Sequence, residues 1–273
     1  MNEPKVIVLD IDGTLFDDEK KIQPKTKEFL IKAQEKGNVV VLASGRPASG
    51  LWYIAEELKM SEHHGLLCCF NGSQVVDCTT TDILYNTPVD INKGREVLKH
   101  LRKFDVTPML YKDAYLYVEN AYAPKVEYES RLCKMMVCEV NDLAAFLNWG
   151  TNKILTAGDP AYLEKHAQEM AAPFKDQLNC MFTAPFYFEF PEKGIDKAKA
   201  IDVALKQLGY TANDCIAFGD AENDLSIIKF AKTGVAMGNA TDEVKNAADY
   251  VTQDNNHEGI YNALKKYMPS LLK

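Results

Sequence analysis

Residues 6–14 read Val-Ile-Val-Leu-Asp-Ile-Asp-Gly-Thr, and this stretch decides the fold. The apolar run before Asp10 predicts a strand buried on both faces, as in a parallel sheet. Ligands bind at the carboxyl ends of such strands. Because residues two apart on an extended backbone point the same way, Asp10 and Asp12 are expected to face one site. Two close carboxylates favour a cation between them or a raised pKa on one, and Mg²⁺ takes such oxygen ligands. The alternative is an ordinary Asp-Gly turn.

Strand and helix signals alternate on both sides of this stretch. Before residue 83, strands are predicted over 6–10, 38–43 and 66–70, and helices over 25–36 and from Pro47 to about 60. After Pro191, helices are predicted over 196–208, 224–231 and 259–267, and strands over 215–219, 234–237 and 250–252. Strand–helix–strand units with short connections predict a parallel sheet with right-handed crossovers.

The pattern changes near residue 83. Strands are predicted over 114–119 and 153–157, a hairpin over 180–190, and helices over 94–104 and 161–171. This middle segment is typical of an α+β module with an open sheet, and Glu189 and Phe190 lie where its hinge is expected. We therefore expect an α/β, Rossmann-like core from residues 1–82 and 191–273, interrupted by an inserted α+β domain over 83–190.

Charge and composition narrow the function. The 273 residues include 31 Lys and Arg against 39 Asp and Glu, a net charge of −8. This balance argues against a general nucleic-acid binder and against docking on anionic membranes. No apolar run approaches the ~20 residues of a membrane span, and the N-terminus does not resemble a secretory signal. Seven cysteines without CxxC spacing indicate reduced thiols in a cytoplasmic protein rather than a zinc site.

Two further strand ends carry polar residues. Ser44-Gly45-Arg46-Pro47 combines a hydroxyl with backbone amides at a helix start, which can make an anion nest; the alternative is a plain serine cap before proline. The run Gly219–Asp224 places carboxylates and an amide after the strand 215–219. Without a cation, so many carboxylates together would not stabilise the fold. The alternative is a loop whose acidic residues cap the next helix. Lys197 lies near a helix start, where a lysine is usually solvated.

Together, these segments resemble the motifs of the haloacid dehalogenase superfamily, whose members mostly transfer phosphoryl groups through an aspartate. Asp10–Thr14 resembles the nucleophile motif, Ser44–Arg46 the phosphate-binding motif, Lys197 the invariant lysine, and Gly219–Asp224 the metal motif. The insertion lies between the second and third motifs, as does the C2B cap of the Cof-type (class IIB) phosphatases. Three shorter segments also resemble that family: Phe70–Ser73, Gly234–Ala240 and Asn256–Ile260. Ser44, where threonine is commoner, and Ala198, where many relatives have glycine, are mild departures.

The resemblance implies a mechanism and a set of roles. Asp10 would attack phosphorus and become an aspartyl phosphate, and Asp12 would act as general acid and then general base. Mg²⁺ would be held by the side chains of Asp10 and Asp220 and the main-chain carbonyl of Asp12, and Asp224 would orient a metal-bound water or Lys197. The residues implied to bind the phosphoryl group are Ile11, Ser44, Gly45, Lys197 and Asn223. For Arg46 two roles stay open: assisting with phosphate, or pairing with a core acid.

The implied substrate is a small phosphate ester. Sugar phosphates are favoured over flavin mononucleotide and pyridoxal phosphate, and a monomer or weak homodimer is expected, with the inserted domain closing over the site. The alternative is a non-catalytic or regulatory phosphate-binding protein, against which the intact Asp10, Asp12, Lys197 and Asp220 argue. A carbon–halogen hydrolase would not need the acid at position 12, and a two-component receiver would lack the insertion.

Overall fold

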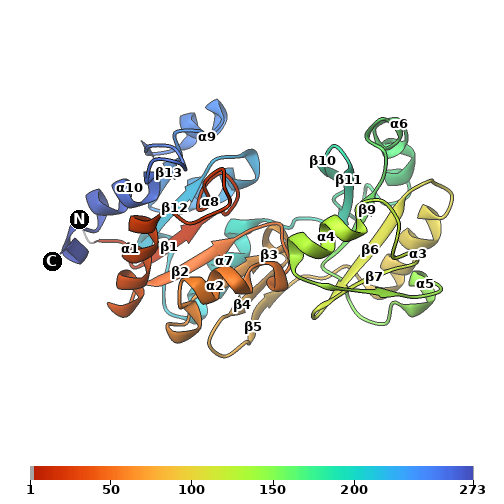
Figure 1. The fold of residues 1–273 in the computed structure, drawn as a ribbon, viewed down its shortest axis with the longest axis horizontal. Coiled ribbons are helices and arrows are strands. Elements are labelled where there is room, and N and C mark those ends of the chain that lie inside the picture. The colour runs from red at the N-terminus through yellow and green to blue at the C-terminus, as the bar shows by residue number, and fades with distance from the viewer. Residues whose placement is uncertain (1–2, 273) are drawn as a thin grey trace. The chain divides into compact units, whose positions relative to one another are not determined.

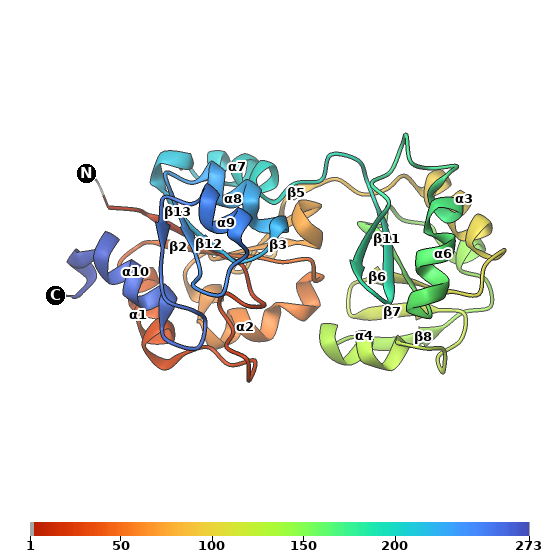
Figure 2. The ribbon, with the colours of Figure 1, turned by 90° about the horizontal axis from the view of Figure 1, so that it is seen from above.

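The computed structural model describes residues 3–272, which divide into two compact units (Figures 1 and 2). The first unit comprises Met1–Tyr85 with Asp196–Lys273, and the second comprises Asn86–Ile195. These boundaries lie three and five residues beyond those expected (85 against 82, and 195 against 190). The shift arises because the strand β5 (Ile83–Asn86) extends the sheet of the first unit, while Glu192 still pairs with Leu178 in the second.

An eight-stranded sheet forms the centre of the first unit. Its order is β14-β13-β12-β1-β2-β3-β4-β5, parallel as far as β3, whereas β4 runs antiparallel to β3. The other strands are β1 (Val6–Leu9), β2 (Val39–Ala43), β3 (Leu66–Cys69), β4 (Gln74–Asp77), β12 (Cys215–Gly219), β13 (Thr233–Ala236) and β14 (Tyr250–Val251). Every residue of β1, β2, β3 and β12 is buried, as a continuous apolar run predicts for central parallel strands. The short pair β4 and β5 was not predicted from the sequence.

Helices cover both faces of this sheet. Figure 2 shows α7, α8 and α9 on one side and α1 and α2 on the other. The helices are α1 (Pro24–Glu35), α2 (Trp52–Glu57), α7 (Lys197–Gln207), α8 (Leu225–Phe230), α9 (Asp242–Ala247) and α10 (Gly259–Tyr267). The helix expected from Pro47 to about residue 60 was wrong in extent: a 3-10 turn (Ala48–Gly50) precedes α2, and Lys59 (φ 56°) ends the helical run before a second 3-10 turn.

The second unit has its own sheet and core. Its strands are β6 (Thr107–Lys112), β7 (Tyr115–Val118), β8 (Met136–Glu139), β9 (Lys153–Ala157), β10 (Met181–Ala184) and β11 (Tyr187–Pro191), in the order β10-β11-β9-β6-β7-β8. Its helices are α3 (Ile91–Leu101), α4 (Val126–Cys133), α5 (Leu143–Phe146) and α6 (Pro160–Ala171). Side chains of α3, α5 and α6 pack with Leu110, Ile154 and Phe190 on one face of the sheet, and α4 contacts the opposite face, where Tyr111 donates to Glu129.

Glu189 and Phe190 do not form the expected hinge. Both lie inside β11, which is hydrogen-bonded to β9 and β10 on its two sides. Phe190 is fully buried, and Glu189 forms a buried ion pair with Lys153 at 2.6 Å. None of the helices in residues 3–272 is long and apolar enough to cross a membrane.

Candidate active site

The carboxyl ends of β12, β1 and β2 lie side by side. β1 is hydrogen-bonded to both neighbours, with Leu9 opposite Phe218 and Leu42. Because the three strands are parallel and in register, the segments that follow them start at the same edge of the sheet. Asp10 follows β1, Asp220 follows β12, and Ser44 follows β2. The separate polar segments found in the sequence therefore converge at one edge.

Lys197 connects two of the aspartates. It is the first residue of α7, 2% exposed, and its Nζ lies 2.7 Å from Oδ1 of Asp10 and 2.7 Å from Oδ1 of Asp224. The alternative of a solvated lysine is thus wrong. A charged ammonium is almost never fully buried unless it is paired, and two carboxylates supply that pairing here.

The start of α7 is held in place by two local features. The side chain of Asp196 accepts a hydrogen bond from the amide of Lys199 at 2.8 Å and so caps the helix. Gly72 (φ +99°) approaches the same point so closely that a Cβ there would lie 2.3 Å from the carbonyl oxygen of Asp196. Only glycine fits this position, which gives a physical reason for the glycine in the segment Phe70–Ser73.

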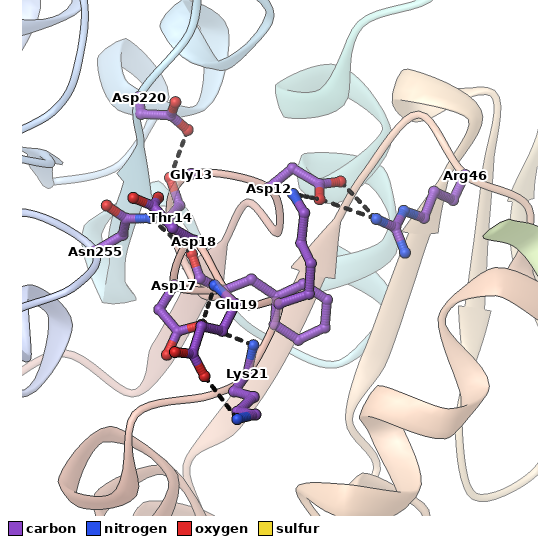
Figure 3. Close-up of polar contacts among 12 residues, drawn as sticks. Asp12, Gly13, Thr14, Asp17, Asp18, Glu19, Lys21, Arg46, Asp220 and Asn255 are labelled. Carbon is purple, nitrogen blue, oxygen red and sulfur yellow. Dashed lines mark hydrogen bonds and ion pairs between the residues drawn. The ribbon is translucent and has the colours of Figure 1, made fainter.

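Three carboxylates form the acidic part of the site. Oxygens of Asp10, Asp220 and Asp224 lie within 4.8 Å of one another. Thr14 Oγ1 donates to Asp220 Oδ1 at 2.8 Å (Figure 3). The second oxygen of Asp224 accepts the amides of Asp220 and Ala221 at 3.1 and 3.2 Å. Since both oxygens of Asp224 already accept hydrogen bonds, Asp224 fixes Lys197 and the loop after β12, and Asp10 and Asp220 are better placed to bind a cation.

The electrostatics of this cluster fit a divalent cation. Burial raises the pKa of Asp10 to about 8; Lys197 opposes the rise, and the carboxylates of Asp224 and Asp220 add to it. Burial likewise raises the pKa of Asp220. Burial alone would lower the pKa of Lys197, but Asp10 and Asp224 raise it overall. One ammonium therefore faces three carboxylates, so the negative charge of the cluster is not balanced by the protein. Mg²⁺ prefers carboxylate oxygens as ligands and would supply the missing positive charge.

The carboxylate of Asp12 is not among the three that lie within 4.8 Å of one another. The backbone turns directly after Asp10, where the carbonyl of Ile11 accepts the amides of Thr14 and Phe16, so the extended-strand rule no longer applies. Instead, Arg46 Nη2 lies 3.0 and 2.7 Å from the two oxygens of Asp12 (Figure 3), and Lys20 Nζ lies 2.9 Å from Oδ1. Partial burial would raise the pKa of Asp12, but these two cations lower it overall.

The expected phosphate-binding residues flank β1 on both sides. Ser44 follows β2 and is 5% exposed, while Asn223 lies in the exposed turn after β12. The Ser44 hydroxyl accepts a hydrogen bond from the amide of Arg46 at 3.3 Å. That amide is therefore already paired, whereas the sequence suggested that the amides after Ser44 could bind an anion. The Ile11 side chain is fully buried in the core. Gly45 lies against Asn71, whose Nδ2 would be 3.1 Å from a Cβ at position 45.

Sequence reasoning missed several residues that shape the loop after β1. Thr14 holds Asp220, Asn239 Nδ2 donates to the carbonyl of Gly13 at 2.8 Å, and Asn255 Nδ2 donates to the carbonyl of Phe16 at 3.0 Å. Figure 3 shows Asn255 beside Asp18, to which it also donates at 3.2 Å. Asn239 belongs to the segment Gly234–Ala240, which resembles the family in sequence, but the resemblance did not indicate what Asn239 does.

Comparison with known proteins assigns the class. A family model described as haloacid dehalogenase-like hydrolase matches residues 7–264, and the chain belongs to the haloacid dehalogenase-like hydrolase family. The resemblance to Cof-type (class IIB) phosphatases inferred from the sequence is confirmed. The chain is 36% identical to a solved haloacid dehalogenase-like hydrolase from Bacteroides thetaiotaomicron, with a TM-score of 0.92 over 97% of this chain and 99% of that one.

The chain is also similar to phosphatases of known substrate class. The subclass IIB sugar phosphatase BT4131 is 26% identical, with a TM-score of 0.78 over 96% of this chain and 98% of that one. The pyridoxal phosphate phosphatase YbhA of Escherichia coli is 27% identical over 268 residues, 94% of this chain and 96% of that protein. Both similarities span nearly the whole of each chain, so they include the inserted segment as well as the core.

Proposed function

We propose that this phosphatase-like chain hydrolyses phosphate monoesters of small metabolites through a phosphorylated Asp10. The observation that carries the proposal is the buried contact of Lys197 with Asp10 and Asp224, beside the carboxylate of Asp220. A nucleophilic carboxylate is poorly reactive towards a phosphate dianion because the two repel each other. Lys197 offsets that repulsion where it and Asp10 are buried, and preorganised charge has its greatest effect in such low-dielectric surroundings.

Two half-reactions follow from this arrangement. An oxygen of Asp10 attacks phosphorus, the bond from phosphorus to the ester oxygen breaks, and Asp12 gives a proton to that leaving oxygen. Arg46 and Lys20 favour the ionised form of Asp12, whereas the negative charge of the bound phosphate ester favours its protonated form. Water then attacks phosphorus, the bond to the Asp10 oxygen breaks, and Asp12 receives a proton from the water. Asp10 is thus regenerated as a carboxylate, and inorganic phosphate and an alcohol are the products.

Asp10, Asp220 and the main-chain carbonyl of Asp12 would hold Mg²⁺. The bound ion would supply positive charge that neutralises phosphoryl oxygens. Asp224 keeps Lys197 and the loop after β12 in position through both of its oxygens. The hydroxyl of Ser44, the amides of Ile11 and Gly45 and the side chain of Asn223 are proposed to bind the remaining phosphoryl oxygens, since they follow the strands beside Asp10.

Sugar phosphates are the proposed substrate class. Support comes from the full-length similarity to the subclass IIB sugar phosphatase, and the similarity to a pyridoxal phosphate phosphatase makes that ester the second one to assay. We propose further that the inserted unit corresponds to the C2B cap of the Cof-type phosphatases and that the protein acts in the cytoplasm as a monomer or weak homodimer.

Steady-state hydrolysis tests the proposal. Purified protein with Mg²⁺ is assayed against an aryl phosphate and about 100 phosphorylated metabolites, alongside Asp10→Asn. Asp202→Asn is the matched control, because Asp202 pairs with Lys206 at 2.6 Å in an exposed contact. We expect turnover by the wild type and the control, and none above background by Asp10→Asn. Full activity of Asp10→Asn, or no hydrolysis by the wild type, would contradict the proposed function and favour a phosphate-binding protein.

A further inference from the structure

The side chain of Arg46 is committed to Asp12 on both carboxylate oxygens. Its Nη2 lies 3.0 Å from Oδ1 and 2.7 Å from Oδ2, and only 10% of the Arg46 side chain is exposed, against 45% for Asp12. Both contacts come from the single nitrogen Nη2, which is held in the plane of a rigid guanidinium. Contact with both oxygens therefore restrains the rotation of the Asp12 carboxylate as well as its position.

Arg46 is itself anchored at three points. Its amide donates to Ser44 Oγ at 3.3 Å, its carbonyl accepts the amide of Phe70 at 3.0 Å, and its Nη1 contacts Tyr53 Oη at 3.3 Å. The backbone of Arg46 is thus held by buried Ser44 and Phe70, and its guanidinium by half-buried Tyr53. Such support from surrounding residues keeps a reacting group close to its productive geometry.

Lys20 touches the same carboxylate in a different way. Its Nζ lies 2.9 Å from Asp12 Oδ1, but 63% of its side chain is exposed. Exposed ion pairs of flexible side chains are screened by water and restrain geometry weakly. The two cations therefore separate the effect of a nearby charge, which both supply, from the effect of a buried and rigidly held donor, which only Arg46 supplies.

We propose that Arg46 is a positioning residue that orients Asp12 for proton transfer, and that it does not bind the substrate phosphoryl group. This inference rests on the proposed function, in which Asp12 moves a proton in each half-reaction. It decides between the two roles that the sequence left open for Arg46. Its Nη2 is committed to Asp12 and its Nη1 contacts Tyr53.

The inference predicts a particular pattern of kinetic loss. A misplaced Asp12 slows proton delivery to the leaving oxygen, so the loss depends on how much the leaving group needs that proton. Arg46→Met should lower kcat for an alkyl phosphate about 10²-fold, the scale of a misplacement of about 1 Å. The burst of phenol from an aryl phosphate, which needs little protonation, should fall by less than about fivefold. Inhibition by inorganic phosphate and KM should change by less than about threefold, since no phosphate contact is lost.

A double-mutant cycle tests the inference. Asp12→Ala, Arg46→Met and the double variant are compared on both classes of ester. If Arg46 acts through Asp12, then Arg46→Met costs less than about threefold further in the Asp12→Ala background. Arg46→Lys keeps the charge but not the planar guanidinium, so its kcat on alkyl phosphates should fall nearly as much as that of Arg46→Met. Arg131→Met is the matched control, because Arg131 pairs with Glu127 on an exposed face of α4.

The outcomes separate the inference from the function on which it rests. The positioning role would be overturned if the rate losses of Asp12→Ala and Arg46→Met multiply in the double variant. It would also be overturned if kcat for alkyl esters and the burst from aryl esters fall equally, or if the affinity for inorganic phosphate weakens. An unaltered kcat of Arg46→Met would overturn it too. No turnover by the wild type would instead defeat the proposed function itself. Where Arg46→Met fails to fold by circular dichroism, Arg46→Lys and Tyr53→Phe decide: both should slow alkyl esters selectively, and no selective loss in either would overturn the inference.

Discussion

Nζ of Lys197 lies 2.7 Å from Oδ1 of Asp10, although 187 residues separate the two in the chain. The contact forms because α7 begins at the same sheet edge at which β1 ends. It brings the proposed nucleophile and its charge partner together in a site where Lys197 is 2% exposed.

Lys197→Met should be close to inactive and less stable. Loss of one preorganised electrostatic donor is expected to lower the rate about 10²–10³-fold. Because the substitution leaves buried carboxylates without their cation, the free energy of unfolding should fall by about 3–5 kcal/mol, measured by urea denaturation. Lys206→Met, which breaks an exposed pair with Asp202, should cost less than about 1 kcal/mol. Equal stability of the two variants would contradict the buried pairing.

A divalent cation should be required for turnover and should stabilise the fold. Exhaustive chelation is expected to abolish hydrolysis, and Mg²⁺ at about 100 times its dissociation constant should stabilise the native state by about 2.7 kcal/mol. Asp220→Asn should remove most of that thermal shift, whereas Asp202→Asn should keep it. Ca²⁺ should support less turnover than Mg²⁺ because it favours looser coordination. Full turnover after chelation would contradict the metal assignment.

The metal-free protein should lose stability as the pH rises. Burial raises the pKa of Asp10 from its ordinary value of about 4 to about 8, so the native state binds more protons than the unfolded state between about pH 4 and 8. Its contribution to stability is fully present below pH 4 and declines through this window, with a slope of at most about 1.4 kcal/mol per pH unit. Asp10→Asn should flatten the profile, measured by urea denaturation in chelator. A wild-type profile that rises over this range would contradict the raised pKa.

Gly72→Ala should impair both stability and activity. Gly72 has φ +99°, and a Cβ there would lie 2.3 Å from the carbonyl oxygen of Asp196, so the start of α7 and Lys197 must move. Gly37→Ala is the matched control, since Gly37 has φ +85° but no atom within 4 Å of its Cβ position. The control should cost only the left-handed backbone penalty of about 1–2 kcal/mol with unchanged kcat. Similar kcat values in the two variants would show that Gly72 does not position Lys197.

Local signals were sufficient for the parallel core. The apolar run before Asp10 and the acidic segment after β12 each mark the end of a strand within a few residues. β1, β2, β3 and β12 could therefore be predicted, and the polar residues that follow them could be placed at one edge of the sheet. Short or exposed elements could not. β8 is mostly exposed and four residues long, and α5 spans only Leu143–Phe146, which is too short to show a helical period.

Pairing with an acid was one of the two roles left open for Arg46, but Asp12 could not be identified as its partner. The pairing with Asp12 depends on the backbone turn at Ile11 and on a contact across 34 residues. The bond from Thr14 to Asp220 spans 206 residues. Neither leaves a local pattern in the sequence, and the resemblance to a family supplied residue roles without these contacts.

Rapid-quench trapping on Asp12→Ala tests the central claim most directly. This variant keeps the nucleophile Asp10 and loses the group that activates water, so an aryl phosphate should give a burst of phenol close to one equivalent per enzyme, followed by slow turnover. Mass spectrometry of the quenched protein should then find one phosphoryl group on the peptide that contains Asp10, and none when Asp10→Asn is added. A burst without phosphorylation of Asp10, or a phosphoryl group on another residue, would contradict the account.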